Sequence, residues 1–392
     1  CISHFMEHML FKGTKKRNPK KIVQAIERVG GLINASTGRE VTYFYIRIAA
    51  KRLELAMDVL TDLVFNPAFV PDSVEREKGV VLEELHMNED DPMQALYDRF
   101  MLTVYGKTAF GRPILGTEET INSFKRKTLR DFHAEYYNPS SLVASIAGGI
   151  DPDKAQNVLE KKLSGFKSSW VKTGGIPKPV KIKPLVRIFE KDVEQAALLI
   201  GFPSTNILSE DRYAFSLLDA ITAGGMMSRL FQEIREKRGL VYSIDSTHQP
   251  FRRGGIFTIE AGMREENLTE VLRLTLRELS RLAKQGPGKR ELEDAKLYLR
   301  GHWALGLEAT ASRMIRNAMA TLFFGRLLAH DEVVSKLSAV TLEDVARSAQ
   351  CAFENGNPAV GALSRFENGN KTSEIENHII ELKEKAFENN LK

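Results

Sequence analysis

The chain has 392 residues, of which 43% are hydrophobic and 27% charged, so it is expected to be globular and is long enough for two domains of ordinary size. Its formal net charge of +5 is spread along the sequence and forms no basic tail, which argues against a nucleic-acid partner. Two cysteines exclude a disulfide scaffold, and no apolar run approaches the roughly 20 residues that span a bilayer, so we expect no membrane span.

The sequence starts with a cysteine directly before a helical pattern, without a methionine or a leading strand. We therefore expect the natural protein to begin upstream of Cys1, so that any signal or transit segment lies outside this sequence. The compartment stays unknown from these residues. A soluble protein of a bacterial cytoplasm or an organelle matrix is the expectation.

The first half of the chain alternates between helical and strand patterns. Residues 18–31 predict a helix that is capped by Asn18 and ends at a glycine pair. Alternating β-branched and aromatic residues predict a strand pair over 32–48. The other elements predicted in this half are helices over residues 2–11, 52–65, 73–89 and 92–104, and a strand over 141–148.

The second half repeats this order in a diverged form. Strands are predicted over residues 196–203, 240–250 and 254–262, and helices over 210–221, 228–239, 268–283 and 289–299. We therefore expect a mixed α+β protein with two domains, residues 1–165 and 186–392. The segment 166–185 is rich in glycine, proline and lysine, which predicts an exposed linker. The region after about residue 330 carries no motif that we can assign.

Two histidines and an acid share one face of the first predicted helix. His4 and His8 are four residues apart, and Glu7 lies beside them at about 100° of rotation per residue. Two imidazoles at this spacing can ligate one zinc ion, with a carboxylate alongside to act on its water. The pattern H-x-x-[D/E]-H arises by chance with a probability of roughly 0.02 in a chain of this composition. Histidines that are buried in the core or solvated on the surface are the alternative.

A catalytic zinc ion needs a third protein ligand, and the predicted helix over 73–89 offers a candidate. Glu77 and Glu84 fall within its apolar arc on a helical wheel, so we expect both acids on the buried face. The arc is defined by hydrophobic residues: Val80, Val81, Leu85 and Met87. Buried carboxylates must be paired, hydrogen-bonded or bound to a cation. An ion pair with a lysine or arginine is the alternative to metal ligation.

The diverged second half does not repeat this constellation. An alignment of the two halves puts Ala295 at the position of Glu77 and His302 at the position of Glu84. The histidine motif has no counterpart at all. We therefore expect the chemistry of the protein to belong to its first half.

Motifs of the chain resemble a known peptidase family. The motif His4-x-x-Glu7-His8, with Glu84 placed 76 residues after His8, is similar to that of the inverzincin zinc metallopeptidases. The chain resembles the pitrilysin/insulinase family, particularly its mitochondrial-processing-peptidase-like branch. Further similar stretches occur in the family's order: "HFMEHMLFKGT", "GGLINASTGREVTYF", "EREKGVVLEE", "GRPILGT", "YYNPSSLVASIAG" and "GGMMSRLFQEIREKRGLVYS".

The resemblance implies an α+β fold of two homologous α/β-sandwich domains, each a mostly antiparallel sheet flanked by helices. In the family, two such domains form one half of a clamshell peptidase. The first domain is expected to carry the zinc ion, and the second to lack a metal. The resemblance also places about 40–50 residues, with the first strands, upstream of Cys1.

The same resemblance implies the roles of the site residues. His4, His8 and Glu84 would hold a zinc ion, with water as the fourth ligand. Glu7 would be the catalytic base that takes a proton from this water and later protonates the leaving amine. Glu77 would be a second acid of the catalytic site, which does not bind the zinc ion itself but holds the geometry of the residues that do.

Substrate-binding residues are implied in both halves. Arg235 and Tyr242 match by spacing a pair that binds the substrate backbone and the developing oxyanion. Without the zinc motif, a solvated Arg235 and a core Tyr242 would be the simpler interpretation. Asn34 and Ala35 resemble the edge strand on which such enzymes bind an extended peptide by β-addition.

These features together predict a zinc metalloendopeptidase. Its substrate would be an unfolded peptide or a leader-like segment, bound as an added strand in an enclosed chamber. Because the chain holds both the zinc set and the arginine–tyrosine pair, we expect a homodimer with two equivalent clefts. The alternatives are a catalytic subunit that works with a metal-free partner chain, and a non-catalytic scaffold subunit on the same fold.

Overall fold

The computed structural model describes residues 1–166, 182, 184–354, 358–366 and 370–387. The chain divides into two compact units. The first unit comprises Cys1–Asn88, Arg112–Gly175 and Gly306–Arg326, and the second comprises Glu89–Gly111, Ile176–Leu305 and Leu327–Lys392. The predicted linker over 166–185 lies almost wholly outside the described residues, and the predicted domain boundaries stay a prediction.

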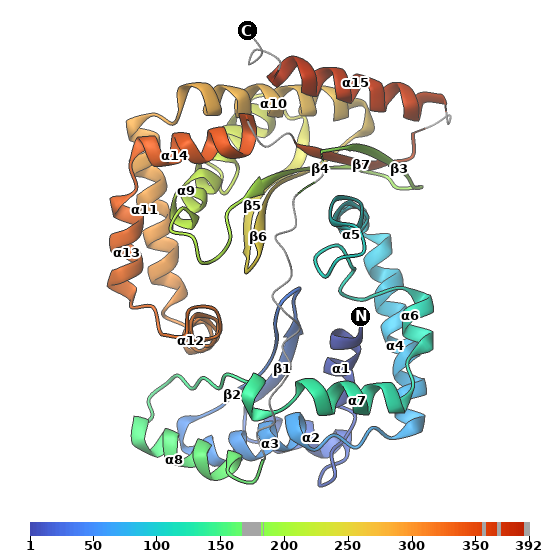
Figure 1. The fold of residues 1–392 in the computed structure, drawn as a ribbon, viewed down its shortest axis with the longest axis vertical. Helices are drawn as coiled ribbons and strands as arrows, with labels where there is room; N and C mark the ends of the chain where they lie inside the picture. Colours follow the sequence, from blue (N-terminus) through green and yellow to red (C-terminus); the bar gives the residue numbers. More distant parts are fainter. Residues whose placement is uncertain (167–181, 183, 355–357, 367–369, 388–392) are drawn as a thin grey trace. The chain divides into compact units, whose positions relative to one another are not determined.

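The first unit consists of helices around a two-stranded sheet (Figure 1). Its helices are α1 (Ile2–Leu10), α2 (Pro19–Glu27), α3 (Leu53–Phe65), α4 (Pro71–Asp90, with its last two residues in the second unit), α6 (Glu118–Ser123), α7 (Arg126–Tyr136), α8 (Pro152–Leu163) and α12 (Thr310–Phe324). Strands β1 (Leu32–Thr37) and β2 (Thr42–Arg47) pair antiparallel, from Leu32 opposite Arg47 to Thr37 opposite Thr42.

Local sequence signals explain where these elements begin and end. The Asn18 side chain accepts a hydrogen bond from the Lys21 N–H at 2.9 Å and caps α2, while Pro19 occupies its first turn. Gly30, with φ of +74°, turns the chain from α2 toward β1 in a conformation that favours glycine. The predicted helix and strand pair of this region are thus confirmed.

The apolar face of helix α1 packs into the core of the first unit and sets the orientation of the helix. Phe5, Met6, Met9 and Leu10 are essentially fully buried, and the Phe5 ring lies 5.1 Å from that of Phe124. Burial of side chains of this size contributes about 1.5–3 kcal/mol each. The core therefore determines which face of α1 carries the polar residues.

The buried stripe of α4 is narrower than predicted. Val74, Glu77, Val81 and Leu85 are buried at the spacing of one helix face. Val80 and Met87, which the wheel placed within the arc, are exposed. Glu84, also expected on the buried face, has a side chain that is 44% exposed. The wheel was wrong for these three because neighbouring elements cover a single stripe of the helix, and not the full apolar arc.

The strand predicted over residues 141–148 is not present. These residues follow the 3₁₀ turn Pro139–Ser141 without regular structure, although Leu142 has extended backbone angles. A strand is defined by its hydrogen-bonded neighbour. In the part of the chain that the structure describes, this segment pairs with no strand.

The second unit is built on a five-stranded sheet of order β3-β7-β4-β6-β5 (Figure 1). Its strands are β3 (Val186–Glu190), β4 (Ala196–Ser204), β5 (Val241–Phe251), β6 (Gly254–Met263) and β7 (Ala359–Ser364). Only β3 and β7 pair parallel; the other neighbours pair antiparallel. Its helices are α5 (Pro92–Tyr105), α9 (Arg212–Thr222), α10 (Leu268–Gln285), α11 (Lys289–Gly306), α13 (His330–Ala339), α14 (Leu342–Ala349) and α15 (Asn370–Phe387).

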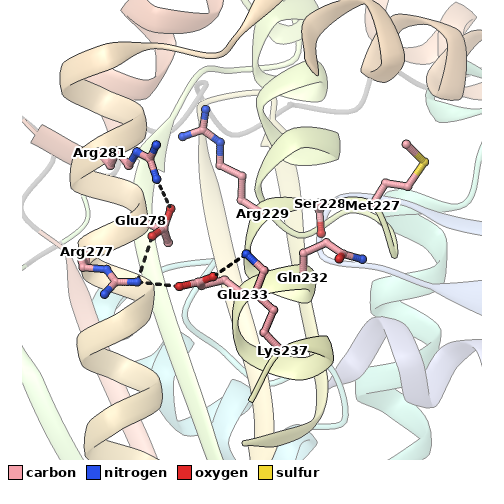
Figure 2. A pocket seen from close by; sticks show the side chains of 9 residues that line it. All are labelled: Met227, Ser228, Arg229, Gln232, Glu233, Lys237, Arg277, Glu278 and Arg281. Carbon is pink, nitrogen blue, oxygen red and sulfur yellow. Dashed lines mark hydrogen bonds and ion pairs between the residues drawn. The ribbon is translucent and has the colours of Figure 1, made fainter. Parts of the chain in front are cut away.

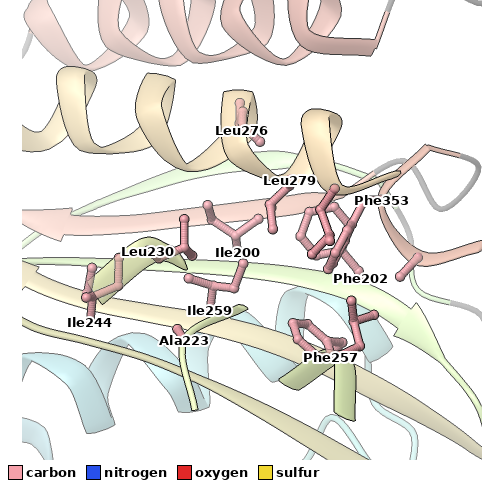
Figure 3. Packing of buried hydrophobic residues seen from close by; sticks show 14 of the residues in the cluster. Ile200, Phe202, Ala223, Leu230, Ile244, Phe257, Ile259, Leu276, Leu279 and Phe353 are labelled. Carbon is pink, nitrogen blue, oxygen red and sulfur yellow. The ribbon is translucent and has the colours of Figure 1, made fainter. Parts of the chain in front are cut away.

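The uninterrupted apolar sequence of β4 reflects burial on both faces of this sheet. Alternate residues, among them Ile200 and Phe202, pack into a core with α10, as Figure 3 shows. The intervening Leu199 packs into a second core with α5. A strand covered on both faces has no reason to alternate with polar residues.

Two glycines make room for α5 on the sheet. A β-carbon on Gly201 would lie 2.7 Å from the Phe100 ring, and one on Gly361 would lie 2.9 Å from it. Such contacts are shorter than packed carbon atoms allow. Helix α5 therefore belongs to the second unit although it lies early in the chain.

A partly buried acid on α9 opposes the folded state of this unit at neutral pH. The Asp219 carboxylate accepts a hydrogen bond from Ser246 Oγ at 2.6 Å. Burial raises the pKa of Asp219 to about 7, more than the hydrogen bonds from Ser246 and the His248 backbone lower it. The folded protein therefore holds this proton more tightly than the unfolded chain does.

Because of this raised pKa, the free energy of unfolding should fall as the pH rises from about 4 to about 7. We predict that Asp219→Asn is more stable than the wild type at about pH 8, by of the order of 1 kcal/mol, and equally stable at about pH 4. Chemical denaturation at the two pH values measures this. Asp294→Asn, which removes an exposed charge from the same unit, is the control; an equal gain there would contradict the prediction.

Candidate metal centre

The polar face of α1 meets α4 at three side chains. Glu84 Oε1 lies 3.5 Å from His4 Nε2, and Glu84 Oε2 lies 3.3 Å from His8 Nε2. The two imidazole rings are 4.7 Å apart between centroids. Within the described residues, this is the one group of three or more His, Cys, Asp or Glu whose ligand atoms all lie within 4.8 Å of one another.

These separations fit a bound cation better than hydrogen bonds. Ligand atoms at about 2.0–2.1 Å from a tetrahedral zinc ion lie about 3.4 Å from one another. The two histidine–carboxylate distances, 3.5 and 3.3 Å, are close to this value and longer than the 2.7–2.9 Å or so of a charge-assisted hydrogen bond. Two imidazoles and one carboxylate are also the donor set of several catalytic zinc sites. The residues present therefore fit a zinc ion.

A second layer of contacts orients His8. Glu77, 3% exposed, places Oε1 2.9 Å from His8 Nδ1 and Oε2 2.8 Å from Lys12 Nζ. Burial alone would raise the pKa of Glu77, but the hydrogen bonds from His8 and Lys12 outweigh it and lower the pKa. An ionised carboxylate can only accept, so His8 Nδ1 carries the proton and the Nε2 lone pair faces Glu84.

Lys12 was missed in the search for functional residues. It lies four residues after His8, which brings it to the same side of the chain as the histidines, and it is part of the quoted "HFMEHMLFKGT" stretch. This spacing is the signal that could have found it. A lysine beside two histidines was overlooked because it is not a zinc ligand.

The pKa values of the two histidines shift in opposite directions. Burial, and then the nearby charge of His8, lowers the pKa of His4 to about 4. Burial also opposes the charged form of His8, but the hydrogen bond to Glu77 and the charges of Glu84, Glu77 and Glu7 raise its pKa. His4 is thus neutral at physiological pH, the form that binds a metal. Its Nδ1 is buried and has no hydrogen-bond partner among the described residues.

Glu7 lies beside the two histidines and is held by the β-hairpin. The Thr37 hydroxyl donates a hydrogen bond to Glu7 Oε2 and lies 3.3 Å from the Thr42 hydroxyl, its cross-strand neighbour. Burial raises the pKa of Glu7 more than the Thr37 hydrogen bond lowers it. Thr37 was not predicted either, because only the packing of β1 against α1 brings it to Glu7.

Asn34 and Ala35, predicted to bind an extended peptide, lie on strand β1 of the hairpin. Asn34 and Ala35 pair with Tyr45 and Phe44 of β2, and within the described residues no strand pairs with the other edge of β1. The Asn34 side chain accepts a hydrogen bond from the Ala35 N–H at 2.8 Å. This edge can therefore take an extended segment.

Arg235 and Tyr242 lie in the second unit, and both are exposed. The predicted helix over 228–239 contains a π-helical turn, Phe231–Glu236, which carries Arg235 with its guanidinium 4.9 Å from the centre of the Phe231 ring. Tyr242 sits at a register shift of β5 against β6 and is 50% exposed. Both irregularities turn the side chains outward, and both occur often at functional sites. Tyr242 is not a core residue.

Comparison with known families assigns the chain. The family described as Insulinase (Peptidase family M16) matches residues 2–118, and the one described as Peptidase M16 inactive domain matches residues 123–299. The chain belongs to the M16 family of peptidases. The family expected from the motifs is therefore confirmed, and the first match contains the whole candidate metal centre.

Bacterial relatives of this M16 chain are named zinc proteases. An uncharacterized zinc protease of Bacillus subtilis is 37% identical over 345 residues, which cover 88% of this chain and 83% of that protein. One of Streptomyces coelicolor is 36% identical over 352 residues, covering 88% of this chain and 76% of that protein. Zinc is therefore the metal associated with these relatives.

Solved structures share the fold. A protease from Helicobacter pylori superimposes with a TM-score of 0.83 at 22% identity, over 93% of this chain and 88% of that one. A structure described as a peptidase M16 inactive domain from Pseudomonas fluorescens gives a TM-score of 0.82 at 22% identity, over 92% and 87%. The expected mixed α+β fold is thus confirmed.

Lys12 should stabilise the protein even without metal, because it partners a buried carboxylate. We predict that Lys12→Met lowers the free energy of unfolding of the chelator-treated protein by about 1–3 kcal/mol, while Lys12→Arg loses much less. Lys78→Met, which removes the pair with the exposed Glu75 on α4, is the control and should cost about 0.5 kcal/mol or less. Equal losses in Lys12→Met and Lys78→Met would show that the Glu77 contact contributes nothing.

Proposed function

We propose that the chain is a zinc-dependent endopeptidase. It hydrolyses unfolded peptides or leader-like segments that bind as an added β-strand in an enclosed chamber. The observation that carries this proposal is the convergence of His4, His8 and Glu84, whose ligand atoms all lie within 4.8 Å of one another. The names of the bacterial relatives support it.

His4, His8 and Glu84 would hold the zinc ion. When bound, zinc supplies the positive charge that polarises the scissile carbonyl and acidifies water. Glu7 accepts the proton of the attacking water and delivers it to the leaving amine. Its raised pKa suits both steps, because a stronger base takes the proton more readily and its acid form is then available to give it back.

The neighbours of these residues maintain the geometry. Glu77 keeps His8 in the tautomer that presents Nε2, and Lys12 keeps Glu77 ionised. Thr37 holds one carboxylate oxygen of Glu7, which leaves the other free for water. Such outer contacts confine the reacting groups to one arrangement before substrate binds.

Substrate binding would use both units. A peptide paired with the edge of β1 at Asn34 and Ala35 presents its backbone in an extended form. Arg235 and Tyr242 would donate to the substrate backbone and to the developing oxyanion, which their exposure permits. By the family resemblance, the zinc domain of one subunit faces the arginine–tyrosine domain of another. We therefore propose a homodimer.

Two alternatives on the same fold are kept. A catalytic subunit of a heterodimer would bind zinc but hydrolyse peptides only with its partner chain. A scaffold subunit would do neither, and the match of residues 123–299 to a family described as inactive keeps this possibility in view. The intact first-half site favours an enzyme, since a scaffold has no need of all four residues.

The place of action is also a proposal. Among the helices of the described residues, none combines the length and apolar character needed to cross a bilayer. The relatives named above come from bacteria. We propose the bacterial cytoplasm, with the organelle matrix as the alternative.

The decisive test compares the wild type with Glu7→Gln, each purified as a single chain. We predict one zinc ion per chain in both by elemental analysis. Hydrolysis of an unfolded peptide should fall by about 10²–10⁴-fold in the variant, because the base is lost while the ligands remain. Wild-type activity in Glu7→Gln would contradict the assignment. A wild type that binds zinc but does not hydrolyse the peptide would favour the heterodimer. A wild type that neither binds zinc nor hydrolyses the peptide would favour the scaffold.

The ligand assignment is tested separately in the same preparations. His4→Ala and Glu84→Ala should each lose stoichiometric zinc, because two remaining protein ligands do not form a closed site. Glu83→Ala, on the neighbouring exposed position of α4, is the matched control and should keep zinc. Retained zinc in Glu84→Ala would exclude it as a ligand.

The oxyanion pair should affect turnover but not metal content. We predict that Tyr242→Phe and Arg235→Ala each lower kcat by about 10²–10³-fold with zinc binding unchanged, because each removes a donor to the developing charge. Steady-state kinetics at saturating peptide measures this. Arg238→Ala, three residues further along the chain, is the control. A change confined to KM would instead assign the two residues to ground-state binding.

A further inference from the structure

A cavity of about 580 Å³ lies in the second unit, beside the turn that carries Arg235 but lined by none of the residues assigned above. The segment Met227–Lys237 forms one side and α10 the other, as Figure 2 shows. Its nine lining side chains are Met227, Ser228, Arg229, Gln232, Glu233, Lys237, Arg277, Glu278 and Arg281. The volume is within the range of small-molecule sites.

Positive charge is in excess around this cavity. Four of the lining side chains are cationic and two are acidic, and their ion-pair partners outside the lining, Arg238 and Glu291, add one of each. The excess is two positive charges. Such a surface attracts a dianion.

The two acids organise the cations and do not repel an anion strongly. Glu233 contacts Lys237 at 3.2 Å, Arg238 at 2.8 Å and Arg277 at 2.8 Å. Arg277 also reaches Glu278, at 3.3 Å. The negative charge of Glu233 is therefore more than neutralised by its three cationic partners, and Glu278 shares Arg277 with it. Figure 2 shows Arg277 between the two acids.

Three of the four lining cations lie much nearer to solvent than the two lining acids do. Side-chain exposure is 47% for Arg277, 62% for Arg281 and 66% for Lys237, compared with 16% for Glu233 and 10% for Glu278. An incoming anion therefore meets guanidinium and ammonium groups first. Arginine forks on one side and a lysine on the other offer donors from several directions.

A buried hydroxyl in the lining lacks a partner. Ser228 is 4% exposed, and its Oγ has no hydrogen-bond partner among the described residues. Leaving a buried hydroxyl unpaired is unfavourable, and few such groups occur in folded proteins. Because Ser228 lines the cavity, a ligand there can supply the missing acceptor.

We propose that this cavity binds a phosphate group, as inorganic phosphate or as the phosphate of a small phosphomonoester. A phosphate dianion matches the excess of two charges, and its oxygens can accept from two guanidinium groups, an ammonium group and a hydroxyl at once. A carboxylate, with one charge and two oxygens, would leave donors unused. The cavity is larger than phosphate alone requires, so it has room for the rest of an ester. The inference is independent of the zinc centre.

The test is calorimetric titration of the purified chain with inorganic phosphate and, separately, with AMP, against sodium chloride at matched ionic strength. We expect saturable binding of at least one probe; the tighter probe identifies free phosphate or an ester as the natural source. Arg277→Gln should weaken binding by about tenfold or more, because it removes a forked donor at the centre of the lining. No saturable binding of either probe would overturn the proposal.

Two further variants separate a site from general charge. Arg273→Gln removes a cation one turn away on α10, where Arg273 pairs with Glu270, and should leave binding unchanged. Ser228→Ala keeps the charge and should weaken binding by about threefold to tenfold. Equal losses in Arg273→Gln and Arg277→Gln, or full binding in Ser228→Ala, would each contradict the proposed contacts. Thermal unfolding of each variant verifies that it is folded.

Discussion

The candidate metal centre depends on one buried carboxylate. Glu77 lies in the apolar stripe of α4, and each of its oxygens is bonded to a side chain from the other segment, His8 and Lys12. A charge at this depth is tolerated only because both partners are present. The contact joins α1 to α4 and sets their register, so that Glu84, two turns further along α4, arrives between the imidazoles of His4 and His8.

The same contact separates the roles of two similar residues. His8 is held by an ionised acid, which stabilises its proton on Nδ1, whereas His4 lies in a less polar environment and is neutral. Two acids differ in the same way. Glu77 has a lowered pKa and serves as a fixed acceptor, while Glu7 has a raised pKa and can exchange a proton. Burial combined with different partners thus shifts the pKa values of four neighbouring groups in different directions.

The second unit has the opposite character. Where α4 buries Glu77, the aligned position of α11 is the buried Ala295, and the core around it is apolar. Helix α10 and the sheet bury rings in close contact, such as Phe353 at 5.0 Å from Phe202 and 5.5 Å from Phe257. The features of this unit that have a proposed role lie outside this core, at the π-helical turn, at the register shift of β5 and at the cavity beside α10. Function in this unit, as proposed, is therefore at its surface.

Much of the centre was readable from the sequence because it depends on helix periodicity. The spacing of His4, Glu7 and His8 defines one face of a helix, and the capping residues of α2 predict its start. Glu77 was correctly expected to be buried. Val80 and Met87 were expected within the buried arc but are exposed. A helical wheel shows which residues share a face, but not how wide a strip of the helix the neighbouring elements cover.

Only the tertiary structure decided the contacts made between distant segments. Lys12 reaches Glu77 from 65 positions away, Thr37 reaches Glu7 because β1 packs against α1, and residues 141–148 have no strand partner in the described structure. The π-helical turn that carries Arg235 also breaks the regular helix that its sequence predicts. Sequence by itself determined the family and which residues share a helix face, because these follow from local spacing and side-chain chemistry. Which groups touch across the core depends on packing, and packing is set by the whole chain at once.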